Sequence, residues 1–159
     1  MESVKHGERI EKVRAYVDEV LLQMTDAAER RCAYVHLYGV AQACAMIAQK
    51  RNTDAELAIV AGMLHDLYAY KTMDHCDHAH KGASMAKEIL SALGLFNRIE
   101  NEMICEAIYR HSDKAESHPA LVETLVDADV WQHCLYNPYV PVSDAKKARF
   151  ERLKKEFGL

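Results

Sequence analysis

The chain has 159 residues, of which 50 % are hydrophobic and 28 % are charged, and its formal net charge is −4. This composition is typical of one folded domain, excludes a disordered chain, and offers no basic surface for a nucleic-acid polymer. Only six Gly and three Pro residues interrupt a sequence rich in helix-forming residues, so we expect an all-α fold.

Three helices are predicted in the first half of the chain. Apolar residues recur every three or four positions over 8–24 and 27–50, and His36 falls on the apolar face of the second helix. A third helix, from about residue 53, ends in an apolar run that leads directly into His65 and Asp66. A buried carboxylate must be paired or bind a metal ion, and an imidazole beside it supplies a second kind of ligand. A solvated helix end would explain the same two residues.

Two further helices follow a polar loop over 71–78. They are predicted over 80–93 and 97–110, and His111 continues the apolar face of the second one. The loop contains three ligand-type residues that are interpreted as ordinary loop residues: His75, Cys76 and His78.

The last two helices are predicted over 117–133 and 144–157. In the first of them, Leu125 lies on the buried row and Asp129 is the next position of that row. Asp127 falls on another face, so its replacement should matter little. The basic residues of the terminal helix are interpreted as a solvated face, and His133 as a surface residue.

Cysteine usage and hydropathy suggest a reducing compartment. The five cysteines are scattered and form no CxxC pair, which argues against a disulfide framework and a structural zinc ribbon. No apolar run approaches the ~20 residues needed to span a bilayer, and the first 14 residues lack a signal-peptide core. A cytoplasmic location without membrane contact is therefore expected.

The predicted helices bring polar side chains toward one interior. Each unsatisfied buried polar group would cost about 1–3 kcal/mol, and convergence on a shared metal ion removes that cost. The six candidate ligands are His36, His65, Asp66, His80, His111 and Asp129.

The order of these motifs resembles the HD superfamily of metal-dependent phosphohydrolases. That family has a His on one helix, a His-Asp doublet ending the next, and a distant Asp, which correspond here to His36, His65–Asp66 and Asp129. His80 and His111 resemble the additional histidines of the branch with two metal ions. The resemblance covers about residues 33–132 and implies a single HD domain over 1–159. We expect a helical bundle of about six to seven helices with its core at about 27–133 and the terminal helices packed on it.

The resemblance also implies a ligand arrangement. His36, His65, Asp66 and Asp129 would hold one divalent ion, and His80 and His111 a second, with Asp66 bridging the two. His65 and Asp66 would be the catalytic pair. The ion could be iron, manganese, cobalt, zinc or magnesium. Lys114, three residues after His111, is the candidate for holding a substrate phosphate.

The implied function is hydrolysis of a phosphomonoester, phosphodiester or phosphoanhydride bond in a small, nucleotide-type substrate. The glycine-containing extension of the cyclic-dinucleotide branch is absent, since Tyr68–Lys71 stand after the doublet, and this argues against a cyclic dinucleotide. Two alternatives share the ligand set: a di-iron oxygenase resembling myo-inositol oxygenase, and a non-enzymatic regulatory module that contains metal. The sequence is compatible with a homodimer.

Overall fold

The computed structural model describes residues 6–159, and this part of the chain contains eight helices and no strand. The helices are α1 (His6–Leu22), α2 (Ala27–Arg51), α3 (Ala55–Leu64), α4 (Leu67–Thr72), α5 (His78–Leu93), α6 (Arg98–Arg110), α7 (Ala120–Tyr136) and α8 (Asp144–Phe157). The all-α prediction is confirmed, and the short helix α4 is an addition to the predicted set. No helix among the described residues is long and apolar enough to cross a membrane.

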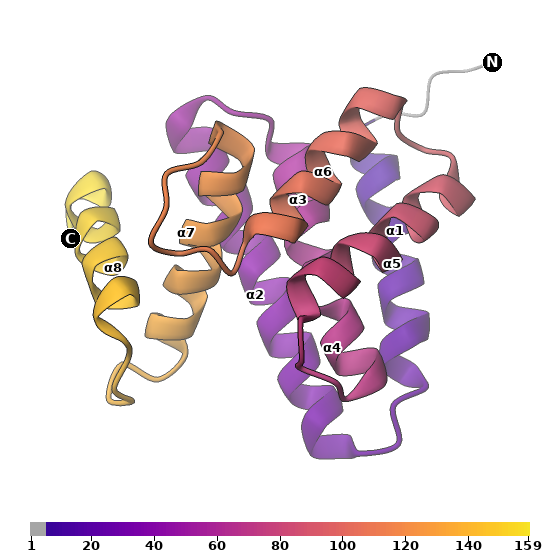
Figure 1. The fold of residues 1–159 in the computed structure, drawn as a ribbon, viewed down its shortest axis with the longest axis horizontal. Coiled ribbons are helices and arrows are strands. Elements are labelled where there is room, and N and C mark those ends of the chain that lie inside the picture. The colour runs from indigo at the N-terminus through magenta and orange to yellow at the C-terminus, as the bar shows by residue number, and fades with distance from the viewer. Residues whose placement is uncertain (1–5) are drawn as a thin grey trace.

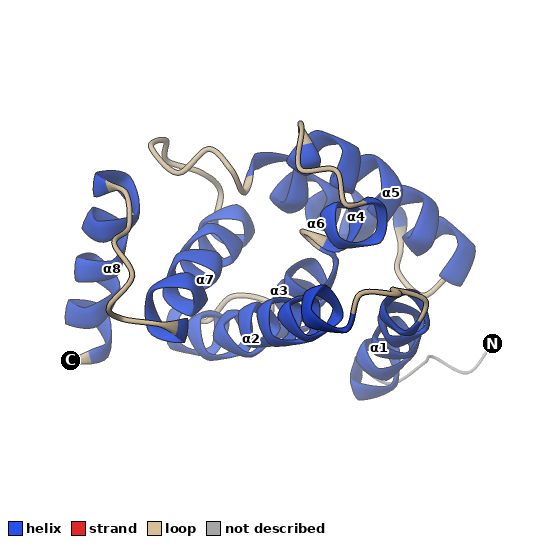
Figure 2. Ribbon diagram, turned by 90° about the horizontal axis from the view of Figure 1, so that it is seen from below, coloured by secondary structure: helices blue, strands red, loops and turns tan. Residues whose placement is uncertain are grey.

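The long helix α2 organises the bundle. It packs against α3 and α7, while α5 and α6 form a second antiparallel pair that joins the rest through contacts of α6 with α3 and α7 (Figure 1). Helices α1 and α8 lie toward opposite ends of the molecule, and α8 contacts α7 (Figure 2). Every helix contributes buried apolar side chains to one continuous core. The largest shares come from α2, α3 and α7, whereas α4 and α8 add only Leu67 and Leu153. The polar centre described below lies where α2, α5, α6, α7 and the α3–α4 junction meet.

Helix α8 is attached through a buried arginine. Arg149 is 5 % exposed and donates to the carboxylate of Asp127 at 3.0 Å and to the carbonyls of Lys114 and Glu116, both at 2.7 Å. Asp127 is 3 % exposed and also accepts from Arg51 at 2.8 Å. Two expectations are therefore wrong. The basic face of α8 is not wholly solvated, and Asp127 is a buried ion-pair partner, because α8 covers the face of α7 that the isolated helix would expose.

Candidate metal centre

The His-Asp doublet occupies the break between two helices. Helix α3 begins after Asp54, whose carboxylate accepts from the backbone N–H of Leu57, and its hydrogen-bonded run ends at Leu64. Asp66 has φ −112° and ψ 8°, a conformation that interrupts the helix before α4 starts. This two-residue break turns the side chains of His65 and Asp66 toward α2, α5 and α6.

Two glycines let the surrounding helices approach the doublet closely. A Cβ on Gly62 would lie 2.8 Å from the backbone Cα of Ala41, so only glycine allows α3 to pack this tightly on α2. A Cβ on Gly82 would lie 3.0 Å from the carbonyl oxygen of His65, so α5 rests directly on the doublet's backbone. These contacts set how near the histidines of α2 and α5 come to Asp66.

The first ligand group joins α2 to the doublet. The Nε2 atom of His36 lies 3.1 Å from Nε2 of His65 and 3.2 Å from Oδ2 of Asp66. The Nε2 atom of His65 is 3.4 Å from the same Oδ2. His65 is fully buried, whereas the side chains of His36 and Asp66 are 16 % and 21 % exposed. The three donor atoms could therefore hold one ion that substrate can still reach.

The second ligand group uses the other oxygen of Asp66. Its Oδ1 lies 3.2 Å from Nε2 of His111 and 3.5 Å from Nε2 of His78. His111 is the residue that ends α6 and is buried, and His78 is the first residue of α5. Asp66 thus presents one carboxylate oxygen to each of two imidazole pairs, which is the arrangement of a bridging carboxylate.

The chemistry of these donors fits a cation. In each of the four histidines, Nδ1 donates to an oxygen that can only accept, which leaves Nε2 with its lone pair directed inward. Those acceptors are the side-chain carbonyl of Gln132 for His36 and the backbone carbonyls of Gly62, His75 and Ile108 for His65, His78 and His111, at 2.6–3.1 Å. Oδ1 of Asp66 is buried and accepts no well-directed hydrogen bond. Apart from the hydroxyl of Ser112, which lies 3.4 Å from Nε2 of His78, these inward-facing groups are acceptors, and such a cluster is unfavourable unless a positive charge lies among them. Carbonyl contacts of this kind typically orient metal-bound histidines.

Asp129 completes the centre from α7. Its Oδ1 lies 3.6 Å from Nε2 of His36, and its Oδ2 accepts from the ammonium of Lys114 at 2.6 Å. Lys114 also donates to the carbonyl of His111 at 3.1 Å. The lysine therefore connects two candidate ligands.

The charges of the site are strongly coupled. Burial alone would raise the pKa of Asp66, but electrostatic interaction with the His65 ring and contacts with the rings of His111 and His36 hold it well below its usual value. Burial would likewise raise the pKa of Asp129, and electrostatic interactions with the ammonium of Lys114 and with the rings of His65 and His36 lower it instead. Both carboxylates are ionised at neutral pH, as metal ligands must be.

Comparison with known proteins identifies the family of this chain. A family model described as the HD domain matches residues 33–133, which is well over half of the chain. The chain belongs to the HD-domain family. Its fold is similar to the crystal structure of a predicted HD superfamily hydrolase from an uncultured Thermotogales bacterium. That match has a TM-score of 0.62 and 23 % identity, and covers 99 % of this chain and 91 % of the other. No match was found among curated proteins.

Within this HD domain, five of the six predicted ligands lie together: His36, His65, Asp66, His111 and Asp129. The sixth does not. His80 is 47 % exposed, its Nδ1 lies 2.7 Å from Asp77, and its ring stacks on Tyr109 at 4.0 Å. Its predicted place at the centre is wrong, because the helix begins at His78 and the ring two residues further on points outward.

His78 is the residue that sequence reasoning missed. It had been interpreted as part of a loop, but it opens α5 and faces Asp66. A signal was present in the sequence, since His78 stands four residues before Gly82 and eight before Ala86, on the buried row of α5. His75 and Cys76 are exposed loop residues, as expected.

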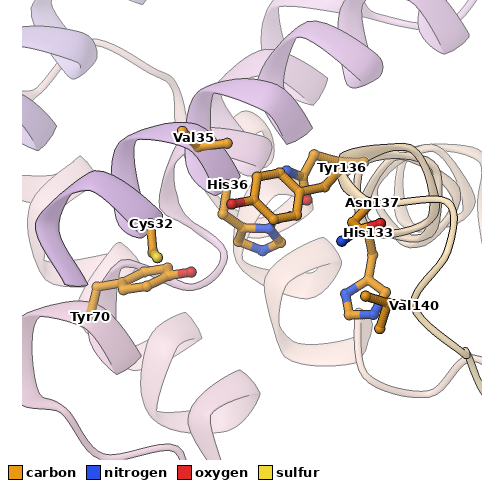
Figure 3. Close-up of a pocket in the computed structure, with 9 residues that line it drawn as sticks. Cys32, Val35, His36, Tyr70, His133, Tyr136, Asn137 and Val140 are labelled. Carbon is orange, nitrogen blue, oxygen red and sulfur yellow. Dashed lines mark hydrogen bonds between the residues drawn. The ribbon is translucent and has the colours of Figure 1, made fainter. Parts of the chain in front are cut away.

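A pocket of about 300 Å³ adjoins the centre at His36. Its wall comes from α2, α4, α7 and the segment after α7, and Figure 3 shows Cys32 and Tyr70 on one side of the His36 ring, with His133, Asn137 and Val140 on the other. The remaining lining residues are Val35, Gln132 and Tyr136. Apart from His36, the sequence assigns none of these side chains to a site, because no metal-ligand or catalytic pattern marks them.

Proposed function

We propose that this HD domain is a metal-dependent phosphohydrolase acting on a small phosphorylated substrate. The observation that carries the proposal is the division of Asp66 between two pairs of imidazole nitrogens, with Oδ2 facing His36 and His65 and Oδ1 facing His78 and His111. Such a site suits two divalent ions that share one carboxylate. Phosphate esters carry negative charge at the reacting centre, and cations held by these ligands would neutralise it.

The ligand residues fall into two sets, one for each ion. His36, His65, Asp66 and Asp129 would hold one ion, and Asp66, His78 and His111 the other. A divalent ion bound there would polarise a phosphoryl oxygen and lower the pKa of a water, the two effects that phosphoester hydrolysis needs at neutral pH. Asp66 shapes both sites, so we assign it, with the fully buried His65, the central role.

We assign Lys114 a positioning role in place of the predicted phosphate contact. Its side chain is 15 % exposed, and its ammonium is already bonded to Asp129 and to the carbonyl of His111. By occupying Oδ2 of Asp129 it leaves Oδ1 directed toward His36. Lys114 therefore holds the orientation of a ligand.

The test separates hydrolysis from oxygen chemistry. Metal-free protein is reconstituted with manganese, zinc or iron, and phosphate release from a panel of nucleotides and simple phosphoesters is measured with and without oxygen. A hydrolase releases phosphate anaerobically and with redox-silent zinc, and Asp66→Asn, which keeps the side-chain volume, abolishes that release. Oxygen uptake in the iron sample alone, with no phosphoester turnover for any ion, would overturn the proposal in favour of an oxygenase.

A further inference from the structure

The pocket beside the metal centre has a polar inner end and an apolar rim. At the inner end, His36 belongs to the first ligand group, and Tyr70 and Gln132 are partly buried beside it. The rim is formed by Val35, Tyr136 and Val140, whose exposed fractions are 43 %, 67 % and 52 %. A substrate with its phosphate at the centre would place its organic part against this rim and cover apolar surface that is now in water.

The pocket wall carries no permanent charge. None of the nine described residues that line it is Asp, Glu, Lys or Arg. His133 is the one titratable imidazole beyond His36, and partial burial together with the charge of Lys146 lowers its pKa, so its ring is neutral at pH 7. Lys146 acts on His133 through space and is not part of the wall. A charged group placed in this pocket would lose hydration without gaining an oppositely charged partner on the wall.

From this distribution of charge we infer that the substrate is a monophosphate ester whose organic part is uncharged and carries a flat ring. The inference rests on the proposed function and narrows its substrate class. The single phosphate has its countercharge at the metal centre, whereas a second phosphate or a carboxylate would lie in the uncharged pocket. The rings of Tyr70 and Tyr136 and the aliphatic groups of Val35 and Val140 supply the flat and apolar contacts that such a ring uses.

The size of the pocket agrees with a small organic group. Small-molecule pockets commonly range from ~300 to ~1,000 Å³, so a pocket of about 300 Å³ stands at the lower end. It accommodates one ring system with its immediate substituents. A dinucleotide or a polyphosphate ester would extend beyond this volume and place additional charge against an uncharged wall.

The test uses two substrates that differ by one carboxylate group on the ring: benzyl phosphate and 4-carboxybenzyl phosphate. With manganese-loaded protein, kcat/KM should be at least about tenfold higher for benzyl phosphate. Val35→Lys places a cation on the rim and should reduce that ratio several-fold. Met46→Lys is the matched control, because Met46 lies on the same helix, is 37 % exposed and does not line the pocket.

A binding measurement separates this inference from the proposed function. Calorimetry with the corresponding benzylphosphonates, which cannot be hydrolysed, should show the same preference for the uncharged ring. Preferential phosphonate binding without phosphate release from any ester would support the pocket assignment and refute the hydrolase. Phosphate release with equal kcat/KM for both esters, or equal effects of Val35→Lys and Met46→Lys, would refute the substrate class and leave the hydrolase standing. Absence of both binding and release would refute both.

Discussion

Replacing His78 with Ala should remove one of the three donor atoms of the second ligand group and leave the first group intact. The second ligand group consists of Asp66 Oδ1, His78 Nε2 and His111 Nε2. His78 opens α5, its side chain is 32 % exposed, and Ala is a good helix former, so the metal-free fold should persist. The expected result is a fall from two bound ions per chain to one.

The size of the effect follows from how few donors remain. Changes that only disturb the partners of metal ligands already weaken binding by about 10–100-fold. Loss of a direct donor from a set of three should weaken the second site by about 100-fold or more. A 100-fold loss corresponds to about 2.8 kcal/mol because each tenfold step is about 1.4 kcal/mol. His80→Ala is the matched control. It removes an exposed contact with Asp77, a kind of pair that contributes about 0–1 kcal/mol to stability, and should leave metal affinity unchanged.

The assay is metal content by mass spectrometry after dialysis against a graded series of chelator concentrations, with thermal melts of the metal-free proteins as the check on folding. Loss of an ion from His80→Ala, or two full ions retained by His78→Ala, would refute our assignment of the second group. A single ion in the wild-type protein under metal-replete conditions would reduce His78 and His111 to contacts that orient Asp66.

Two further changes test how the fold holds the site. Arg149→Met should lower the free energy of unfolding, measured in urea, by about 3–5 kcal/mol, because it removes one partner of a buried ion pair and leaves two carbonyls without their hydrogen bonds. Arg152→Met, at an exposed position on the same helix, is the control and should change it by less than about 0.5 kcal/mol. An equal effect of the two changes would contradict the role of α8 described above. Gly62→Ala should cost about 1–3 kcal/mol because its methyl group would meet the backbone of Ala41, and it should also weaken metal binding by shifting α3. Gly7→Ala is the control, because the added methyl group meets nothing within 4 Å, and it should raise stability by up to about 1 kcal/mol. A Gly62→Ala variant with unchanged stability and unchanged metal affinity would argue against the close α2–α3 contact.

The sequence by itself determined the helices and most of the centre. In a helix, the position of a residue in the sequence fixes the side on which its side chain lies. The positions of His36, His111 and Asp129 on apolar rows were therefore enough to predict that their side chains point inward. The doublet could be recognised because His65 and Asp66 directly follow an apolar run, where polar side chains would be buried and would need a partner. These are local properties of single helices.

The spacing of His78 to Gly82 and Ala86 is compatible with an inward side chain, but the sequence does not show that α5 extends to His78, so the tertiary structure decided between His78 and His80. Their directions depend on where α5 begins, and that is fixed by the left-handed backbone of Asp77, with φ 54°, and by a loop tied back through the Asp74–Lys81 ion pair at 2.7 Å. The pattern of residues over 80–93 is compatible with a helix starting on either side of this point.

The buried ion pair of Arg149 and Asp127 and the substrate pocket were also decided by tertiary structure. From the sequence alone, a charged residue on a helix is expected to be solvated unless a neighbouring helix is known to cover it. Here that neighbour is α8, and the sequence does not specify the path of the segment that joins it to α7. The pocket is built by residues of α2, α4, α7 and the following segment that are ordinary surface or core types in their own helices. Their common function arises from proximity between distant segments, which periodicity within one helix cannot encode.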